Sequence, residues 1–380
     1  MLKMVRFGDA FMMRKGIKAE ETERTSTSIR YIQIDDLRND NHIKYCGNNP
    51  RYVKATERDI VIAWDGANAG TSNFGLVGAI GSTLAVLKTE VKEIYTPYVG
   101  LLIKSKFRFL RGNCTGATIP HLNRAVVEEI QIPIHPMEVQ QQIAQTLEKA
   151  SQLISLRKKQ LEELDNLMKS IFCNMFGDLV TNEKGWESHL LGDISEIVSG
   201  ITKGRKLSTT NTISMPYMRV ANVKDGYLDL GVIKYIDISE RELKQFALEI
   251  GDVLLTEGGD PDKLGRGAVW KGQIEKCIHQ NHIFRVRIKN ANINSVYLSM
   301  IIGSNYGKKY FFRAAKQTTG IASINMTQLK KFPVLIPPFD LQTQFAAIVE
   351  KIEEQKLLVQ KAMDESQHLF DGLMDKFFGE

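Results

Sequence analysis

The stretches HPMEVQQQIA, at residues 135–144, and PPFDLQTQFA, at residues 337–346, are two versions of one short text. They lie 202 positions apart, and neither copy holds an obvious catalytic group. Without any gap the match runs on to MFGD at 175–178 and to FFGE at 377–380. Because internal repetition can decide the architecture of a chain, this match predicts one structural unit that is present twice.

The region that precedes each copy also recurs, although more loosely. The offset between matching segments drifts from 184 to 204, as insertions in surface loops would make it. The matching pairs are Phe7-Gly8-Asp9 with Leu191-Gly192-Asp193, Ile43-Lys44-Tyr45 with Ile233-Lys234-Tyr235, Asp59-Ile60-Val61-Ile62 with Asp252-Val253-Leu254-Leu255, and Thr115-Gly116 with Thr319-Gly320. The order is therefore globular, helical, globular and helical, over residues 1–135, 136–178, 179–335 and 336–380.

Both helical segments carry apolar residues at alternating spacings of four and three. Such a 3.5-residue period, sustained over this length, is typical of a coiled-coil seam. Polar residues interrupt the seam at Arg157, Lys356 and Ser366, where they could fix the register at some cost in stability. The predicted seam residues are Ile143, Leu147, Ile154, Leu161, Leu164, Met168 and Ile171 in the first helix, and Phe345, Val349, Ile352, Val359, Met363, Phe370 and Leu373 in the second.

The charges of the chain are distributed unevenly. Residues 1–135 hold 19 Lys/Arg against 14 Asp/Glu, and residues 179–335 hold 22 against 15. The segment 136–178 holds 5 against 6, and the segment 336–380 holds 4 against 9. A polyanion would be drawn to the globular parts and weakly repelled by the helices. The alternative is a chance scatter of solvated charges.

The direction in which the two helices pair is open, because helices joined by a whole domain could pair either way round. We predict an antiparallel coiled coil, which relates the two globular units by a pseudo-twofold axis and matches the twofold relation between the strands of duplex DNA. The helix pair would then set the distance between two half-sites on the DNA. The plain alternative is a helix hairpin that braces two domains without setting any such distance. The longest apolar runs are too short for a membrane span, and no signal-peptide pattern is visible, so we expect a cytoplasmic protein.

No motif in the sequence supplies chemistry. GSNYGKK at 303–309 has three residues between its glycines, where a phosphate-binding loop needs four, and no Ser or Thr follows its lysines. The acids within 260–263 and the Asn-Pro-Arg at 49–51 also lack the partners that a nuclease or a methyltransferase site needs. Metal-ligand spacing is missing from Cys46, Cys114, Cys173 and Cys277. We therefore expect a chain that is inert alone, with no metal and no cofactor of its own.

Basic, amide and hydroxyl side chains on loops are the candidates for DNA contacts, because they neutralise phosphates and reach base edges. In the first globular unit the candidates are Arg14, Lys15, Lys18, Lys104, Lys106, Arg108 and Arg111. In the second they are Lys203, Arg205, Lys206, Thr209, Thr210, Lys308, Lys309, Arg313, Lys316 and Gln317. Each of these residues could also be an ordinary solvated charge or polar group, and Lys106 and Arg108 could alternate outward along a strand.

The repeated text resembles the end of each half in the specificity subunits of type I restriction–modification enzymes. The similarity rests on IPIHPMEVQQQIA followed by MFGD, and on LIPPFDLQTQFA followed by FFGE. It also rests on the buried-strand texts at 59–64 and 251–256, and on TTGIASINMTQLKKFPVLIPP at 318–338. The resemblance covers essentially the whole chain. One departure is His135, which interrupts the double proline in the first copy.

The resemblance implies an α+β protein with two target recognition domains, 1–135 and 179–335, and two spacer helices, 136–178 and 336–380. It implies a non-catalytic subunit that reads a bipartite, asymmetric sequence in double-stranded DNA. Its expected partners are two modification (methyltransferase) subunits and the restriction subunits, which would supply S-adenosylmethionine, ATP and magnesium chemistry. Two alternatives remain, a coiled-coil scaffold whose basic domains bind protein, and a nuclease or methyltransferase with an undetected site.

Overall fold

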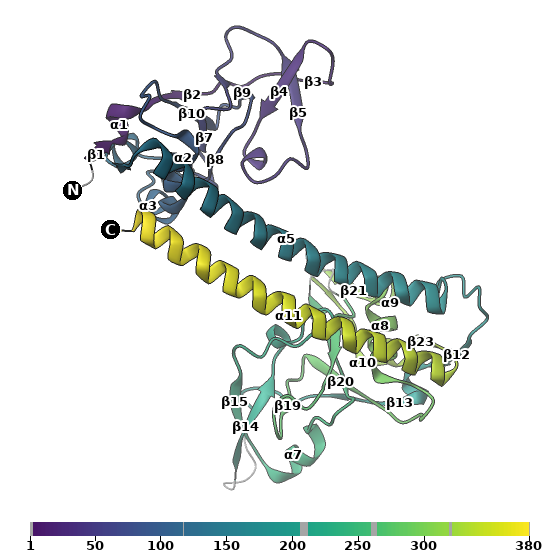
Figure 1. Ribbon diagram of the computed structural model, residues 1–380. Helices are drawn as coiled ribbons and strands as arrows, with labels where there is room; N and C mark the ends of the chain where they lie inside the picture. Colours follow the sequence, from purple (N-terminus) through teal and green to yellow (C-terminus); the bar gives the residue numbers. More distant parts are fainter. Residues whose placement is uncertain (1–2, 117, 206–211, 260–263, 319–320, 380) are drawn as a thin grey trace. The chain divides into compact units, whose positions relative to one another are not determined.

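The chain divides into two compact units (Figure 1). Unit 1 comprises residues 1–159 and 359–380, and unit 2 comprises residues 160–358. Two long helices, α5 (Met137–Phe176) and α11 (Phe339–Phe378), contribute to both units. The structure is a computed structural model, which describes residues 3–116, 118–205, 212–259, 264–318 and 321–379, without the side chains of 316–318 and 321.

Unit 1 is built from two larger sheets and short helices. One sheet has the strand order β2-β10-β7-β8, the other has the order β3-β5-β4-β9-β6, and β1 pairs with β11. The strands are β1 (Lys3–Arg6), β2 (Met12–Lys15), β3 (Glu21–Thr22), β4 (Ser28–Ile32), β5 (Lys44–Gly47), β6 (Lys54–Ala55), β7 (Ile60–Ala63), β8 (Ser72–Phe74), β9 (Gly78–Ile80), β10 (Leu84–Lys88) and β11 (Gln131–Ile134). The helices besides α5 and α11 are α1 (Phe7–Ala10), the 3-10 helix η1 (Asp35–Leu37), α2 (Thr96–Ser105), α3 (Phe107–Gly112) and α4 (Arg124–Glu128).

Unit 2 repeats this plan. Its larger sheets have the orders β13-β20-β16-β18, β15-β14-β19 and β17-β22-β21, and β12 pairs with β23. The strands are β12 (Glu187–Leu190), β13 (Ser195–Ser199), β14 (Ile213–Met218), β15 (Lys234–Ile238), β16 (Val253–Thr256), β17 (Gly258–Gly259), β18 (Gly267–Val269), β19 (Ile278–His279), β20 (Ile283–Ile288), β21 (Lys316–Thr318), β22 (Ile321–Ser323) and β23 (Pro333–Ile336). The helices are α6 (Leu191–Ile194), the 3-10 helix η2 (Val220–Asn222), α7 (Glu240–Phe246), α8 (Ser295–Gly303), α9 (Asn305–Ala314) and α10 (Met326–Lys330).

The central strands β7 and β16 are fully buried, as the texts at 59–64 and 251–256 predict. Each follows a buried aspartate whose carboxylate ties a turn to the neighbouring strand. Asp59 accepts from the Thr56 amide at 2.7 Å and from Lys88 Nζ at 3.0 Å. Asp252 accepts from the Glu249 amide at 2.7 Å and from Arg287 Nε at 2.8 Å. The repeat is therefore confirmed at the level of individual contacts.

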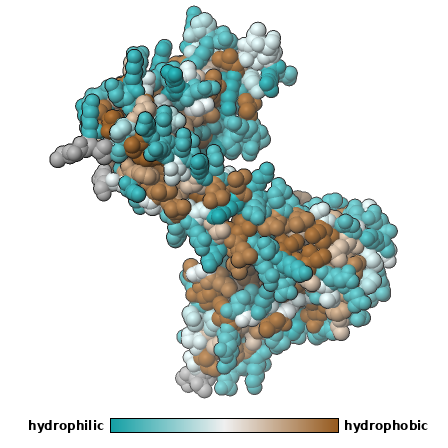
Figure 2. Space-filling model, in the orientation of Figure 1, coloured by the Kyte–Doolittle hydropathy of each residue, from teal (hydrophilic) through white to brown (hydrophobic). Residues whose placement is uncertain are grey.

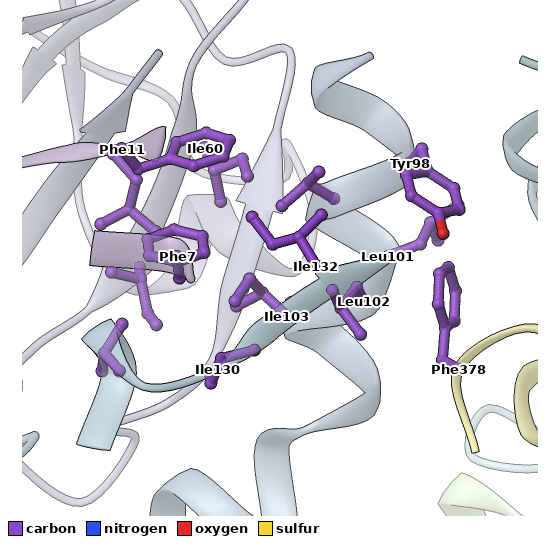
Figure 3. Packing of buried hydrophobic residues seen from close by; sticks show 14 of the residues in the cluster. Phe7, Phe11, Ile60, Tyr98, Leu101, Leu102, Ile103, Ile130, Ile132 and Phe378 are labelled. Carbon is purple, nitrogen blue, oxygen red and sulfur yellow. The ribbon is translucent and has the colours of Figure 1, made fainter. Parts of the chain in front are cut away.

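The core of unit 1 lies between its sheets and its helices (Figure 3). Tyr98 on α2 and Phe378 near the end of α11 meet there, with 5.2 Å between ring centroids. Ile143 and Leu147, near the start of α5, belong to the same buried cluster as Met374 and Phe378. The start of one long helix thus packs beside the end of the other.

Unit 2 has the reciprocal arrangement. Phe172 and Phe176, at the end of α5, pack edge-to-face against Phe345, near the start of α11, with ring centroids 5.3 and 5.4 Å apart. Together the two units establish that α5 and α11 run antiparallel, as predicted. All predicted seam residues are buried or half-buried.

The most buried residues near the C-terminal end of each long helix lie one position beyond the predicted seam. Phe172 and Phe176 are almost fully buried, whereas their neighbours Ile171 and Met175 are half-buried. Met374 and Phe378, 202 positions later, repeat the pattern. The shift occurs because these helix ends leave the helix–helix contact and enter the core of a globular domain.

The polar residues of the seam are paired across it. In unit 1, the Arg157 guanidinium donates to Ser366 Oγ and to the Ala362 carbonyl. In unit 2, Lys356 Nζ lies 2.8 Å from Asp165 Oδ1. The Lys356 ammonium is compensated by the Asp165 carboxylate, whereas the half-buried Arg157 guanidinium is hydrogen-bonded to neutral acceptors, so neither group is left without a partner.

The repeated text itself encodes a buried amide clamp. Gln140 is fully buried at the first turn of α5. Its Oε1 accepts from the Tyr95 amide at 2.9 Å, and its Nε2 donates to the Glu93 and His135 carbonyls at 2.7 and 2.8 Å. The side chain thus uses both of its N–H donors and one of its two acceptor lone pairs. These hydrogen bonds hold the segment before α2 against the start of the long helix.

Gln342, 202 positions later, makes the same three contacts in unit 2. It is also fully buried, accepts from the Asn294 amide at 2.9 Å, and donates to the Asn292 and Pro337 carbonyls at 3.0 and 2.7 Å. The recurring glutamine is therefore a joint between a domain and its helix, which explains why the text recurs without any catalytic group.

Candidate nucleic-acid interface

The predicted basic residues of unit 1 lie on regular elements more often than on loops. Arg14 and Lys15 belong to β2, and Lys104 lies near the end of α2. Arg108 and Arg111 belong to α3, so the possible strand through Lys106 and Arg108 is wrong. Of the other two candidates, Lys106 lies in the turn between α2 and α3, and Lys18 follows β2 outside any helix or strand. Leu110 is the buried residue of the six-residue helix α3 and anchors it to the core of unit 1.

Several basic groups of unit 1 surround the segment that follows β7. Lys15 Nζ lies 2.5 Å from Asp65 Oδ2, and His121 Nδ1 lies 2.6 Å from Asp65 Oδ1. Arg111 donates to the Gly66 carbonyl at 3.1 Å. Lys15 and Arg124 also line a cleft of about 300 Å³ together with Met13, Trp64, Ala85 and Leu122.

Asp65 is held ionised by its two partners. Burial alone would raise the pKa of its carboxyl group, but the hydrogen bonds from His121 and Lys15 outweigh burial and lower the pKa. Asp65 therefore stays an acceptor that fixes both side chains, and Lys15, Arg111 and Arg124 together keep the cluster cationic. Such a cluster attracts an anion to the rim of the cleft.

The other cations of unit 1 differ in how strongly they are engaged. Arg14, Lys18 and Arg108 are exposed and form no ion pair with any residue that the structure describes. Lys104 Nζ donates to Asn73 Oδ1 at 2.9 Å and lies 4.8 Å from the centroid of the Phe74 ring. The three unpaired residues can therefore reach a phosphate without first breaking an ion pair.

In unit 2, one predicted contact residue is structural. Arg205 Nε lies 2.6 Å from Glu242 Oε1, and its NH2 donates to the Asp237 carbonyl at 3.1 Å. The hydrogen bond from Arg205, helped by the capping box that Ser239 forms, lowers the pKa of Glu242 to about 2. Lys203 is exposed in a turn. Lys206, Thr209 and Thr210 lie outside the described residues.

Helix α9 carries Lys308, Lys309 and Arg313, so the expectation that these candidates lie on a loop is wrong. Ser304 caps this helix, because its Oγ accepts from the Gly307 amide at 3.5 Å. Lys308 pairs with Asp225 at 3.1 Å. Lys309 and Arg313, one turn apart, line a groove of about 390 Å³ with Val180, Tyr306, Tyr310, Ala314 and Pro333. Lys316 and Gln317 belong to β21, and their side chains lie outside the described part of the structure.

Two acid–histidine contacts were missed at the level of sequence. His121 meets Asp65 across 56 positions, and His282 Nδ1 lies 2.7 Å from Glu257 Oε2 across 25 positions. No spacing rule predicts either pair, because the loops that join the partners determine their distance. Among the described residues, no group of three or more His, Cys, Asp or Glu is arranged to hold a metal ion.

The cysteines and the hydropathy of the helices give two further findings. All four cysteines are free thiols, and Cys46 and Cys277 are buried. Within the described ranges, none of the helices is both long and apolar enough to cross a membrane.

Comparison with known proteins defines the family. The model described as the type I restriction modification DNA specificity domain matches residues 2–166 and again residues 183–365. The two matches cover most of the chain, and the chain belongs to this family.

Individual relatives agree with this assignment. The chain is 27% identical over 324 residues to the Type I restriction enzyme MjaVIII specificity subunit of Methanocaldococcus jannaschii, which covers 81% of this chain and 76% of the relative. The fold is similar to that of the S subunit of a type I restriction-modification system from M. genitalium, with a TM-score of 0.58, 15% identity and coverage of 100% and 96% of the two chains. A structure described in terms of complex assembly and conformational transition of the type I R-M system gives a TM-score of 0.56 at 16% identity, covering 99% and 97%.

Proposed function

We propose that the chain is the DNA-reading subunit of a type I restriction–modification enzyme and that each unit holds one target recognition domain. The observation that supports this most is a single frame built twice in a chain of this family, with different side chains exposed on each copy. Two different readers on one chain suit a bipartite, asymmetric site in double-stranded DNA.

Cationic groups beside the clefts of both units support DNA as the ligand. In unit 1 these are Lys15 and Arg124, and in unit 2 they are Lys309 and Arg313. Phosphate contacts position a protein on DNA, whereas contacts to base edges give sequence specificity. The proposed division of labour is that these cations, with Arg14, Lys18 and Arg108, hold the backbone while neighbouring side chains read bases.

The flank of the helix pair supports docking of two identical partners. Leu156 on α5 is 64% exposed, and Leu358, 202 positions later on α11, is 60% exposed. Leu167 and Leu369 form a second repeated pair on the same flank, since each precedes a seam residue by one position. The opposite flank is more polar: it carries Ser151, Lys158, Asp165, Glu353, Gln360 and Gln367 beside one exposed leucine, Leu357.

Such an apolar flank is costly to leave in water and fits an amphipathic helix of a partner. Figure 2 shows hydrophobic residues at the surface of unit 2 on its visible face. Because unit 1 holds Leu156 and Leu369 and unit 2 holds Leu358 and Leu167, each unit offers its own docking flank. The proposed occupants are two modification subunits, and restriction subunits would join them. Methylation with S-adenosylmethionine and ATP-dependent cleavage with magnesium would belong to these partners.

An exchange of recognition domains tests the proposed function. Residues 1–135 are replaced by the corresponding part of another family member, and the methylated sites are mapped genome-wide in cells that also express the partner subunits. The exchange should alter one half of the recognised sequence and leave the other half and the gap unchanged. Changes in both halves would contradict the assignment of one half to each unit.

A second experiment tests the docking flank. Leu156→Gln with Leu358→Gln should abolish co-purification with the modification subunit, while Lys158→Ala with Gln360→Ala on the opposite flank should leave it intact. Equal loss in both double variants would show that the flank is not specific.

Salt-titrated DNA binding separates the proposal from a scaffold whose basic domains bind protein. A DNA-reading subunit loses affinity steeply as salt rises, because bound phosphates release counterions. A protein-binding scaffold shows no such loss.

A further inference from the structure

The two long-range acid–histidine pairs occupy the same place in the two units. In unit 1 the segment after β7 is held by the Trp64 amide, which donates to the Thr83 carbonyl at 2.8 Å. In unit 2 the Glu257 amide donates to the His282 carbonyl at 3.0 Å. Trp64 and Glu257 therefore hold equivalent positions at the carboxyl end of the central strand, and each pair is assembled there.

The residues that form the two pairs are not equivalent. In the backbone pairing, Asp65 lies opposite His121 in unit 1, and Gly258 lies opposite Ser323 at the equivalent place in unit 2. A glycine and a serine therefore stand in unit 2 where unit 1 has its acid–histidine pair. His282 in turn stands where unit 1 has a threonine. An acid–histidine pair therefore occurs at the same location in both units, although the residues that form it do not occupy equivalent positions of the repeat. A shared requirement at this location explains that coincidence, whereas duplication of the chain does not.

Stability gives little reason for either pair. His121 and His282 are 48% and 58% exposed, although Asp65 and Glu257 are only 14% and 34% exposed, and a pair with one solvent-exposed partner contributes little to folding. Each carboxylate does, however, fix one imidazole by accepting from its Nδ1. Nε2 of either histidine makes no hydrogen bond to any residue that the structure describes, so each ring retains one nitrogen for an external partner.

The chemistry of that nitrogen selects a class of ligand. With a carboxylate accepting from Nδ1, the imidazolium form of the ring presents Nε2–H outward as a hydrogen-bond donor. In unit 1, Lys15 Nζ sits on the same carboxylate at 2.5 Å and adds a second donor beside the first. In the major groove, guanine presents two acceptors, N7 and O6, and adenine and thymine present only one each.

We propose that His121 and His282 are base-reading residues, one in each recognition domain, and that each donates from Nε2 to a guanine edge in the major groove. Asp65 and Glu257 are positioning residues that hold the rings through Nδ1. The inference rests on the proposed function, since it names the residues that read bases within it.

Site-directed variants of the assembled complex provide the first test. His121→Ala and Asp65→Asn should each relax the recognised sequence at one guanine of the half-site read by unit 1, with at least a tenfold fall in discrimination there. His282→Ala and Glu257→Gln should do the same in the other half-site only. Methylated sites mapped by long-read sequencing give the readout.

The chain offers a matched control. His189 Nε2 lies 2.9 Å from Glu187 Oε1, two positions away on β12, which is another exposed acid–histidine pair at a different place in the fold. His189→Ala should leave the recognised sequence unchanged. An equal effect of His189→Ala would overturn the proposal, because the response would then not depend on the location.

A second measurement needs no variant and therefore does not depend on folding of a mutant. The unaltered complex is titrated with its recognition site after each guanine in turn is replaced by 7-deazaguanine, which lacks the N7 acceptor. Affinity should fall about tenfold at one guanine of each half-site. If a bipartite methylated sequence exists but no guanine is sensitive, base reading by these histidines is wrong while the proposed function stands. If no bipartite sequence is found, the proposed function itself fails.

Discussion

Units 1 and 2 have the same frame but different interiors. Ile80 and Val86 are fully buried and apolar in unit 1. At the equivalent positions of unit 2, by strand register, stand His279 and Arg285, which are equally buried. His279 lies 3.2 Å from both the Val198 and the Phe246 carbonyls.

The difference shows which positions the architecture requires. The contacts that join each domain to the helix pair are the same in both copies, as Gln140 and Gln342 show. The interior of the sheet, in contrast, accommodates either apolar or polar side chains at the same positions. The Arg285 guanidinium is partly satisfied, because NH1 donates to the Gln245 and Ala247 carbonyls at 3.2 and 3.0 Å while Nε is buried without a partner among the described residues. A buried polar group is acceptable when its partners are supplied locally.

The largest effect is expected at the shared joint. Gln140→Leu leaves the Tyr95 amide and two carbonyls without partners, and should lower the free energy of unfolding of unit 1 by about 4 kcal/mol. Gln342→Leu should cost unit 2 a similar amount. Urea unfolding measures both.

The other repeated glutamines are the control for the joint. Gln142 and Gln344 are exposed, so Gln142→Ala and Gln344→Ala should change stability by less than about 0.5 kcal/mol. A cost at the exposed pair as large as at the buried pair would disprove the clamp.

A smaller effect, the loss of stability at low pH, is expected from the interior of unit 2 but not from that of unit 1. Burial lowers the pKa of His279 from its ordinary value of 6.5 to about 4. The unfolded chain therefore binds more protons between these values, so stability is complete above pH 6.5 and falls by about 3 kcal/mol as pH drops towards 4. Ile80 in unit 1 does not titrate.

Urea unfolding at pH 7 and at pH 4.5 checks this expectation. His279→Ile should flatten the pH dependence of unit 2 between these values, even though it lowers stability at pH 7 by removing a hydrogen bond. An unaltered slope in the variant would contradict the role of His279.

The smallest effect concerns surface charge. Lys309→Ala with Arg313→Ala should reduce the salt dependence of DNA binding by about 2 in the log–log slope, because each lost phosphate contact removes roughly 0.9. Lys308, which is paired with Asp225, and Arg205, which is paired with Glu242, should change the slope less when replaced by Ala. Filter binding at several salt concentrations measures the slope for each variant and ranks the variants by their effect.

The sequence predicted the architecture better than it predicted the candidate DNA-contact residues. Periodicity predicted the two long helices, and the duplicated text predicted that the domains repeat, because both signals reside in neighbouring residues. The helix α3 was missed because six residues with one buried side chain carry too little periodic signal, whereas α9 was missed although its ten residues are amphipathic. Arg205 was taken for a DNA contact because its partner, Glu242, lies 37 positions away.

The sequence by itself determined the duplication, the two helices, the buried central strands and the family. Only the tertiary structure decided which of the repeated glutamines is buried, which cations are already paired, and where His121 and His282 meet their carboxylates. The physical reason is that repeats and periods are properties of the chain order, whereas pairing, burial and protonation depend on distances between segments that folding alone brings together.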